Sequence, residues 1–253
     1  MARTTVITGS ASGIGAALRR RLEAEGERVV GVDLVDAEVI ADLATPEGRA
    51  AMVADVAAAT DGVVDAVVAN AGVSLPDPLT VRVCYFGAVA TLEGLRPLLT
   101  RGSVPRAAAT ASIAVLGPLD DDLVAACLAG DEATACAHPA ASSLLAYGSA
   151  KRALARWLRA AAPGPDWAGA GIPLNAVGPG VVTTPMTAEL LATDEGRALV
   201  DGAVPMPPGG HAEAAHVAEV LAFLIGPGTA RITGQVLFVD GGADAVLRGD
   251  DIW

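Results

Sequence analysis

The sequence predicts a single α/β domain in which a doubly wound parallel sheet carries helices on both faces. Two observations lead to this prediction. Short apolar runs rich in β-branched residues alternate along the chain with longer alanine-rich segments of helical period. The short runs are almost continuously apolar, as strands buried on both faces of a sheet must be. No linker or internal repeat interrupts residues 1–253, so we expect one domain.

The same alternation assigns a place to each element. Strands are expected over Thr4–Thr8, Arg28–Asp33, Val63–Asn70, about Ala107–Ser112, about Ile172–Val177 and Gln235–Asp240. Helices are expected from about Gly13, near Pro46, near Pro78, from about Ser143 and before Gly226. Two segments, 117–142 and 185–210, interrupt the pattern. Because long loops inside a compact domain are usually binding loops or lids, we expect both to be substrate-loop segments.

Composition and charge exclude several classes of protein. A net charge of -12 and an isoelectric point near 4.6 repel polyanions, so nucleic acid is not an expected partner. Apolar stretches are broken before they reach bilayer length, and the first residues run directly into a strand, so we expect no membrane or signal segment. Three cysteines without zinc or CxxC spacing and three scattered histidines predict reduced thiols and no metal site. We therefore expect a cytoplasmic protein.

A glycine-rich turn follows the first expected strand and opens a helix. Its sequence, Thr8 to Gly15, has the spacing G-x-x-x-G-x-G. In this context glycines permit a tight turn, and backbone N–H groups at the helix N-terminus can approach a pyrophosphate. An ordinary strand-to-helix turn is the alternative, but the position after the first strand favours a Rossmann-type dinucleotide site. The candidate cofactor contacts are Gly9, Ser12, Gly13, Ile14 and Gly15.

Asp33 ends the second expected strand about twenty residues after this turn. A carboxylate there can accept hydrogen bonds from an adenosine ribose and would repel a 2′-phosphate. No basic residue stands immediately after Asp33 or inside the turn, so NAD(H) is favoured over NADP(H). A helix-capping or solvated aspartate is the alternative. Asp42 and Leu43 are further candidates beside the adenine, although Asp42 is equally consistent with a surface charge.

The candidate chemistry lies at Tyr147 and Lys151, four residues apart on one face of an expected helix. Lys151 is the only lysine among 17 lysines and arginines, which suggests a position where a guanidinium does not serve. A phenol ionises at about pH 10 in water, so proton exchange at neutral pH needs nearby positive charge, which Lys151 would supply. Ser112, at the carboxyl end of its expected strand, would hold a substrate oxygen beside Tyr147.

Together with two glycine motifs near the end of the chain, these residues resemble the short-chain dehydrogenase/reductase family in its classical-length form. The resemblance rests on the glycine turn, Asn70-Ala71-Gly72, Ser112, Tyr147 with Lys151, Pro179-Gly180 with Thr184, Ile232-Thr233-Gly234-Gln235 and Asp240-Gly241-Gly242, and it covers essentially the whole chain. Within the family the sequence is most similar to bacterial 3α-hydroxysteroid dehydrogenase/carbonyl reductases. That similarity lies in ADLATPEGR, CYFGA, DGGADAV and the long segment between Ser112 and Tyr147.

The resemblance implies an NAD(H)-dependent oxidoreductase that interconverts a ketone and a secondary alcohol. Ser112, Tyr147 and Lys151 would be catalytic; Tyr147 and Lys151 would also border the cofactor, with Lys151 bonding the nicotinamide ribose. Further cofactor contacts would come from Asn70, Ala71, Gly72, Pro179, Gly180, Val182 and Thr184, the last two holding the carboxamide. A homodimer or homotetramer is also implied. Residues 117–142 would obstruct one helix interface, which favours the dimer, and Trp253 would either dock on a neighbouring subunit or fray.

One position departs from the family pattern. Cys84 stands where the family usually has an asparagine in the helix after Gly72, and a buried thiol that packs as a small hydrophobe is the favoured interpretation. In relatives a main-chain carbonyl at this position is thought to hold a water of a proton relay, so activity would survive the change. The departure motivates a second hypothesis, a non-catalytic NAD-binding sensor or scaffold. A dehydratase or epimerase is a weaker third, because the chain lacks the extra C-terminal domain of such proteins.

Apolar residues near the interrupting segments indicate an apolar pocket lining. With this lining, the resemblance implies a small hydrophobic cyclic substrate, such as a steroid, terpenoid or polyketide-like compound. The candidate lining residues are Leu116, Leu144, Leu145, Val181, Met186 and Leu190. A steroid, a terpenoid and a polyketide fragment are all compatible with these residues.

Overall fold

Seven parallel strands form the central sheet of residues 2–250, the part of the chain that this computed structural model describes. The strand order is β3-β2-β1-β4-β5-β6-β9, so the chain winds outward from β1 first in one direction and then in the other. The strands are β1 (Thr4–Thr8), β2 (Arg28–Asp33), β3 (Val39–Ile40), β4 (Ala66–Ala69), β5 (Arg106–Thr110), β6 (Leu174–Pro179) and β9 (Val236–Val239). A separate parallel pair is formed by β7 (Val182–Thr183) and β8 (Ala212–Glu213). Trp253 lies outside the described residues.

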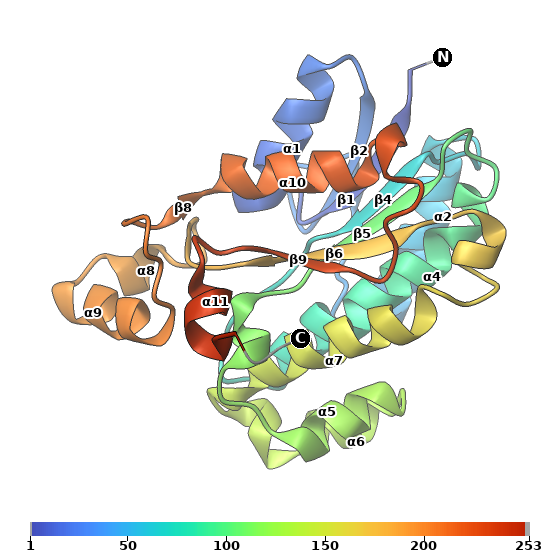
Figure 1. Cartoon of the computed structure of the whole chain (residues 1–253). Helices are drawn as coiled ribbons and strands as arrows, with labels where there is room; N and C mark the ends of the chain where they lie inside the picture. Colours follow the sequence, from blue (N-terminus) through green and yellow to red (C-terminus); the bar gives the residue numbers. More distant parts are fainter. Residues whose placement is uncertain (1, 251–253) are drawn as a thin grey trace.

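Helices cover both faces of the sheet (Figure 1). One face packs on α1 (Gly13–Ala24) and α10 (Ala214–Ile225), and the other packs on α2 (Pro46–Ala59), α4 (Ala88–Leu99) and α7 (Leu145–Ala161). The shorter helices are α3 (Pro78–Val81), a π-helical segment (Arg82–Gly87), α5 (Asp121–Leu128), α6 (Glu132–Ala137), α8 (Ala188–Leu191), α9 (Asp194–Ala203) and α11 (Ala243–Arg248). The predicted single-domain, Rossmann-type, doubly wound fold is thereby confirmed.

The expected elements are present, with shifts at their ends. β4 begins at Ala66 rather than Val63, because the Val63 N–H bonds to the Thr60 carbonyl in the turn that leaves α2. The two segments expected as loops contain helices of their own, α5 and α6 in residues 117–142 and α8 and α9 in residues 185–210. The side chains of Asp120, Asp131 and Thr193 accept backbone N–H groups at the starts of α5, α6 and α9.

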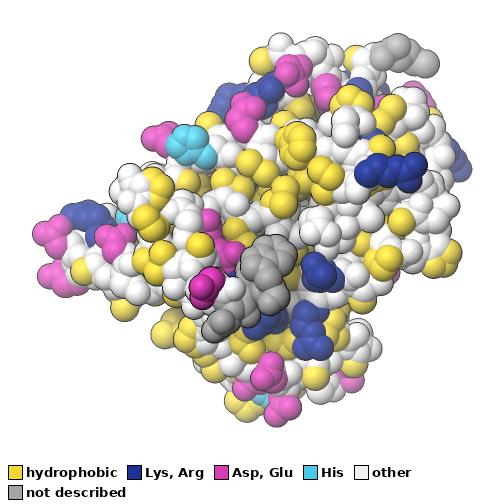
Figure 2. Space-filling model, in the orientation of Figure 1, with side chains coloured by type: hydrophobic (Ala, Val, Ile, Leu, Met, Phe, Trp, Pro, Cys, Tyr) yellow, Lys and Arg dark blue, Asp and Glu magenta, His cyan; other side chains and the backbone are white. Residues whose placement is uncertain are grey.

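These two helical segments occupy different places. Helix α5 packs on α7 and buries Leu123, Val124 and Cys127, and Ser149 Oγ of α7 accepts the Asp120 N–H at 2.9 Å. Helices α8 and α9 instead project from one end of the sheet. None of the residues of α9 is buried, and charged side chains cover this projection (Figure 2). The first segment is therefore part of the packed body, whereas the second is a protruding unit.

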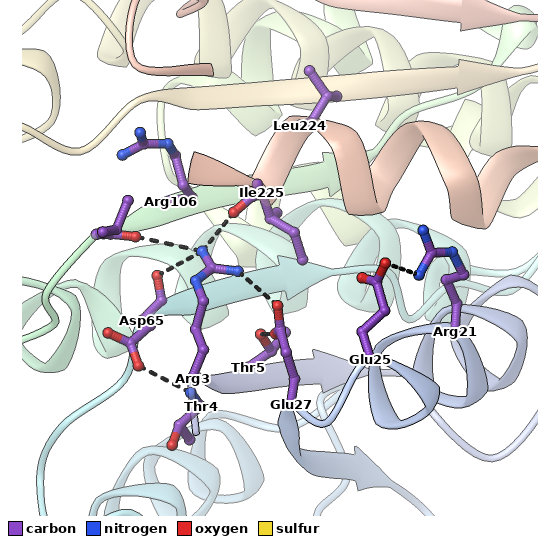
Figure 3. A network of polar contacts seen from close by, with 12 residues as sticks. Arg3, Thr4, Thr5, Arg21, Glu25, Glu27, Asp65, Arg106, Leu224 and Ile225 are labelled. Atoms are coloured by element: carbon purple, nitrogen blue, oxygen red, sulfur yellow. Dashed lines mark hydrogen bonds and ion pairs between the residues drawn. The ribbon is translucent and has the colours of Figure 1, made fainter. Parts of the chain in front are cut away.

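A polar network closes the amino ends of the strands (Figure 3). The Arg3 guanidinium donates to the carbonyl oxygens of Asp65, Val104 and Ile225. It also pairs with Glu27, at an N–O distance of 3.3 Å. One arginine thus joins the starts of β1, β4 and β5 to the end of α10, at the sheet edge opposite the carboxyl ends of the strands.

Replacing Asp65 by asparagine is expected to destabilise the fold by about 1–3 kcal/mol at neutral pH. Asp65 Oδ2 accepts the Thr4 N–H at 2.9 Å, and Oδ1 accepts the backbone N–H and the hydroxyl of Ser103. Burial raises the Asp65 pKa, but these three hydrogen bonds outweigh burial, so the pKa lies below its ordinary value. An amide nitrogen would face one of these donors.

The sign of the pH dependence follows from that direction. A lowered folded-state pKa means that the carboxylate stabilises the fold above about pH 4 and that this contribution is lost as the pH falls through the folded-state pKa. Urea unfolding from about pH 7 to about pH 2 should therefore show the gap between wild type and Asp65→Asn closing in acid. Asp55→Asn, an exposed charge on α2, is the control; equal effects of the two variants would contradict the prediction.

Candidate active site

A cavity of about 300 Å³ opens at the carboxyl ends of the parallel strands. It runs past the turn after β1, the end of β2, the segments after β4 and β5, helix α7 and the segment after β6. Ligands of open α/β sheets bind at this edge, where the strand order reverses, and the volume suits a small molecule. The topology alone therefore makes this cavity the candidate site.

The glycine turn forms one wall of the cavity. Gly9 and Gly13 have left-handed backbones, with φ of 69° and 52°. A Cβ at Gly9 would lie 2.8 Å from the Ala71 Cα, and one at Gly13 would lie 3.4 Å from Thr184 Cγ2. Gly9 therefore lets the turn pack closely on the Ala71 backbone, whereas a side chain at Gly13 would extend toward Thr184; both glycines line the cavity at the N-terminus of α1.

Gly15 supports the turn from behind and does not line the cavity. A Cβ at this position would lie 2.0 Å from the Gly9 carbonyl oxygen and 2.7 Å from Asn70 Nδ2. A glycine is required here because α1 packs closely against the turn, and not because the residue contacts a ligand.

Asp33 stands at the end of β2 with its carboxylate held in place. Oδ2 accepts the Ala11 N–H at 2.9 Å, and Oδ1 accepts the Leu34 N–H at 2.7 Å. Asp33 and Leu34 both line the cavity. The charge therefore faces the cavity between the glycine turn and the end of β2, where an adenosine ribose would need an acceptor.

Asn70 ties three strands together beneath the site. Its Nδ2 donates to the carbonyls of Thr8 at 3.2 Å and Gly9 at 3.3 Å, and its Oδ1 accepts the Thr110 hydroxyl at 3.0 Å. Because Thr8 and Thr110 end β1 and β5 and Asn70 directly follows β4, the amide fixes the floor of the cavity.

The predicted catalytic group, Ser112, Tyr147 and Lys151, lies around one part of the cavity. Lys151 is 3% exposed, its Nζ donates to the Thr110 carbonyl at 2.7 Å, and it lies 5.8 Å from the centroid of the Tyr147 ring. Ser112 is 7% exposed, and its Oγ accepts the Ala114 N–H at 3.1 Å while still lining the cavity. A phenol, an ammonium and a hydroxyl thus border the same cavity, a set suited to exchanging a proton with a substrate oxygen.

Thr187 is a site residue that the sequence interpretation missed. Its hydroxyl donates to the Val182 carbonyl at 2.6 Å and accepts the Thr184 N–H at 3.1 Å. Thr187 therefore orders the segment that carries both expected carboxamide contacts. The signal was the second threonine of Thr184-Pro185-Met186-Thr187, which recurs one helical turn after the first.

Cys84 is fully buried in the π-helical segment, and its thiol donates to the Val73 carbonyl at 3.2 Å. A Cβ at Gly72 would lie 3.4 Å from Cys84 Sγ and 3.5 Å from Lys151 Nζ, so the thiol and the ammonium flank the same glycine. The position suits the packing interpretation of a small hydrophobe. The catalytic group stays assembled despite the cysteine, which favours an enzyme over a sensor.

The cavity gathers most of the residues named from the sequence. The predicted cofactor residues that line it are Gly9, Ser12, Gly13, Ile14, Asp33, Asp42, Leu43, Asn70, Ala71, Gly72, Tyr147, Lys151, Pro179, Gly180, Val182 and Thr184. Of the predicted substrate residues, Met186 lines the cavity. The other five, Leu116, Leu144, Leu145, Val181 and Leu190, do not. No residue of 117–142 lines the cavity either, because α5 packs on α7 and α6 packs on α3, α5 and the π-helical segment. Leu34, Val73, Leu79, Val83 and Thr187 line it and were not foreseen.

The histidines serve local structure. His211 Nε2 lies 2.8 Å from Asp201 Oδ1, and His216 Nδ1 accepts the Glu213 N–H at 3.1 Å at the start of α10. Within residues 2–250, no three His, Cys, Asp or Glu side chains converge as metal ligands. No helix in that range is long and apolar enough to cross a bilayer.

Fold and site together define a nicotinamide-dependent oxidoreductase, and comparison with known proteins agrees. A family profile described as enoyl-(acyl carrier protein) reductase matches residues 133–244. The 3-alpha-hydroxysteroid dehydrogenase/carbonyl reductase of Comamonas testosteroni is 39% identical, over 96% of this chain and 97% of that protein. The chain belongs to the short-chain dehydrogenase/reductase family.

Two further relatives extend the comparison. The cis-4-hydroxycyclohexanecarboxylate dehydrogenase of Sinomonas cyclohexanicum is 32% identical over 96% of this chain and 97% of its own length. The crystal structure of the 3-alpha-hydroxysteroid dehydrogenase from Pseudomonas sp. B-0831 in complex with NADH superposes with a TM-score of 0.91, at 42% identity, covering 98% of this chain and 99% of that one. These similarities confirm the family and the subgroup that the motifs indicated.

Proposed function

We propose that the protein is an NAD(H)-dependent oxidoreductase that interconverts a ketone and a secondary alcohol on a small hydrophobic cyclic substrate. The observation that carries the proposal is the buried Lys151 ammonium beside Tyr147, with Ser112 on the same cavity. The names of the two steroid relatives and of the cyclohexanecarboxylate relative support a ring compound. Steroid, terpenoid and polyketide-like rings are all within the proposal.

The residues present fit a dinucleotide. Gly9 and Gly13 line the cavity at the N-terminus of α1, and Asp33 presents an acceptor at the end of β2. When bound, the dinucleotide supplies or accepts a hydride at its nicotinamide ring. Asn70, Ala71, Gly72, Val182 and Thr184 would hold its other parts, as the family resemblance implies.

The side chains of the catalytic group would handle the proton. The Tyr147 hydroxyl would donate its proton to a developing alkoxide, or accept one in the reverse direction. The Lys151 ammonium places a positive charge near the phenol ring and is itself bonded to the Thr110 carbonyl. The Ser112 hydroxyl would orient and stabilise the substrate oxygen.

The test of this function is turnover. Purified protein with NADH should reduce members of a panel of cyclic ketones and ketosteroids, and with NAD it should oxidise the matching alcohols, measured by absorbance of the reduced nicotinamide. Intact NAD binding without turnover of any carbonyl or alcohol would instead favour the non-catalytic sensor.

Asp33 is expected to set the cofactor preference. Wild type should favour NADH over NADPH by at least about tenfold in kcat/KM, because a fixed carboxylate would face the 2′-phosphate. Asp33→Asn should narrow that ratio, mostly by improving NADPH. Asp36→Asn, an exposed carboxylate in the same loop, is the control. An unchanged ratio in Asp33→Asn would assign the preference elsewhere.

We propose that the protein forms a cytoplasmic homodimer. Residues 117–142 cover the outer side of α7, while hydrophobic side chains are exposed over α10 (Figure 2). Phe223 of α10 and Val246 and Leu247 of α11 are 54%, 54% and 44% exposed. A second copy would cover this face, and light scattering should give twice the chain mass of 25.1 kDa. The three unpaired thiols suit a reducing compartment.

A further inference from the structure

Arg49, in the first turns of α2, is a nearly buried cation outside the catalytic group, with 9% of its surface exposed. Its Nε donates to the Leu43 carbonyl at 2.7 Å. Its Nη2 donates to the carbonyls of Ala44 and Arg82, both at 3.3 Å. One guanidinium therefore joins the segment after β3 to the π-helical segment.

The countercharge for Arg49 comes from the inserted helices. Glu132, at the start of α6, receives two bonds from the guanidinium, Nη1 to Oε2 at 2.6 Å and Nη2 to Oε1 at 2.9 Å. The guanidinium carbon also lies 5.9 Å from the centroid of the Phe86 ring. A planar, forked cation is required here, because Arg49 bonds three carbonyls and a carboxylate at once.

The carbonyl-bearing segment held by Arg49 is a wall of the cavity. Ala41, Asp42 and Leu43 all line the cavity. Leu43 also packs closely on the π-helical segment, since a Cβ at Gly87 would lie 3.1 Å from both its Cβ and its carbonyl oxygen. We call residues 41–44 the Leu43 wall. Arg49 holds this wall from behind, through its last two carbonyls.

The Leu43 wall lies at the adenosine end of the proposed dinucleotide site. It follows β3, which pairs with β2, and so it stands beside Asp33. The catalytic group is placed by β5 and α7, and β5 is three strand positions from β2 in the sheet. That separation is about 14 Å at ordinary strand spacing. A change in the Leu43 wall should therefore affect one end of the dinucleotide and spare the reacting end.

We propose that residues 117–142 act on the cofactor rather than on the substrate: through Glu132 and Arg49 they hold the Leu43 wall in the shape that binds the adenosine part of the dinucleotide. This proposal rests on the proposed NAD function. Without the Glu132 charge, the buried guanidinium is left uncompensated and is drawn toward water, so that the Leu43 and Ala44 carbonyls lose their donor. Arg49 and Glu132 are thus positioning residues, not catalytic ones.

The test measures binding of ADP-ribose, which is the dinucleotide without its nicotinamide ring, by calorimetry on the full-length protein. Glu132→Gln should weaken ADP-ribose and NAD by about five- to tenfold, with kcat at saturating NADH within about twofold of wild type. Arg49→Lys should weaken ADP-ribose similarly, because it keeps the charge but loses the fork. Asp122→Asn, an exposed carboxylate of α5 in the same insertion, removes the same charge and should change nothing.

Each outcome separates this inference from the proposed function. ADP-ribose binding by Glu132→Gln as tight as by wild type would overturn the inference, as would a raised KM for the carbonyl substrate with unchanged ADP-ribose affinity. Failure of wild type to bind NAD at all would refute the proposed function instead. If circular dichroism shows that Glu132→Gln is unfolded, Glu132→Asp takes its place. The shorter side chain keeps the negative charge but moves it away from Arg49, so ADP-ribose affinity should still fall by about threefold. Unchanged affinity in that variant would count against the inference.

Discussion

Tyr147→Phe is expected to lower kcat by about 10²- to 10⁴-fold while leaving the NAD dissociation constant nearly unchanged. The substitution removes a single oxygen from a ring that borders the cavity and keeps its packing on α7. That hydroxyl is the group to which the proposed mechanism assigns proton exchange with the substrate oxygen. Steady-state kinetics with NADH and the best ketone, alongside calorimetric titration of NAD, would measure both quantities.

The chain offers a matched control for this change. Tyr85, the only other tyrosine, is 3% exposed in the π-helical segment, and its burial raises its pKa further above the ordinary range of a phenol. Tyr85→Phe should therefore leave turnover unaffected. Turnover by Tyr147→Phe within tenfold of wild type would remove the phenol from the mechanism, whatever the control shows.

Lys151→Arg is expected to lower kcat/KM by about 10²- to 10³-fold even though the charge is retained. The ammonium fits a small space, since it donates to Thr110 at 2.7 Å and lies next to Gly72, where a Cβ would stand 3.5 Å from it. A planar guanidinium is larger and would have to displace the thiol of Cys84 on the other side of that glycine. Proton exchange at Tyr147 should become slower, and binding of the nicotinamide ribose should become weaker.

The reverse exchange on the same helix is the control. Arg156 is exposed on α7, so Arg156→Lys should behave as wild type. Comparing the KM for NADH with kcat in Lys151→Arg would separate the two expected losses. Full activity in Lys151→Arg would show that positive charge alone suffices at this position. The argument that only an ammonium fits the space would then be wrong.

The ion pair between Arg49 and Glu132 could not be predicted from the sequence. The ADLATPEGR segment was recognised as a mark of the family subgroup, but nothing in it indicates that Arg49 reaches a carboxylate 83 positions further along the chain. The sequence likewise predicts the insertion at the substrate, whereas α5 packs on α7 and Glu132 of α6 bonds to Arg49 of α2. Side-chain partners across such separations depend on how helices pack, which spacing along the chain does not encode.

The sequence alone predicts those features of the site that depend on local spacing, although the helices inside residues 117–142 and 185–210 are not among its predictions. The Gly9 and Gly13 turn, Asp33 at a strand end and the Tyr147–Lys151 pair one helical turn apart follow from periods of two and 3.6 residues and from strand-to-helix geometry. The tertiary structure alone decided which carbonyl holds Lys151, that Cys84 shares a glycine with that lysine, and which apolar side chains line the cavity. The physical reason is that these contacts form between segments brought together only when the two faces of the sheet are covered and the core is close-packed.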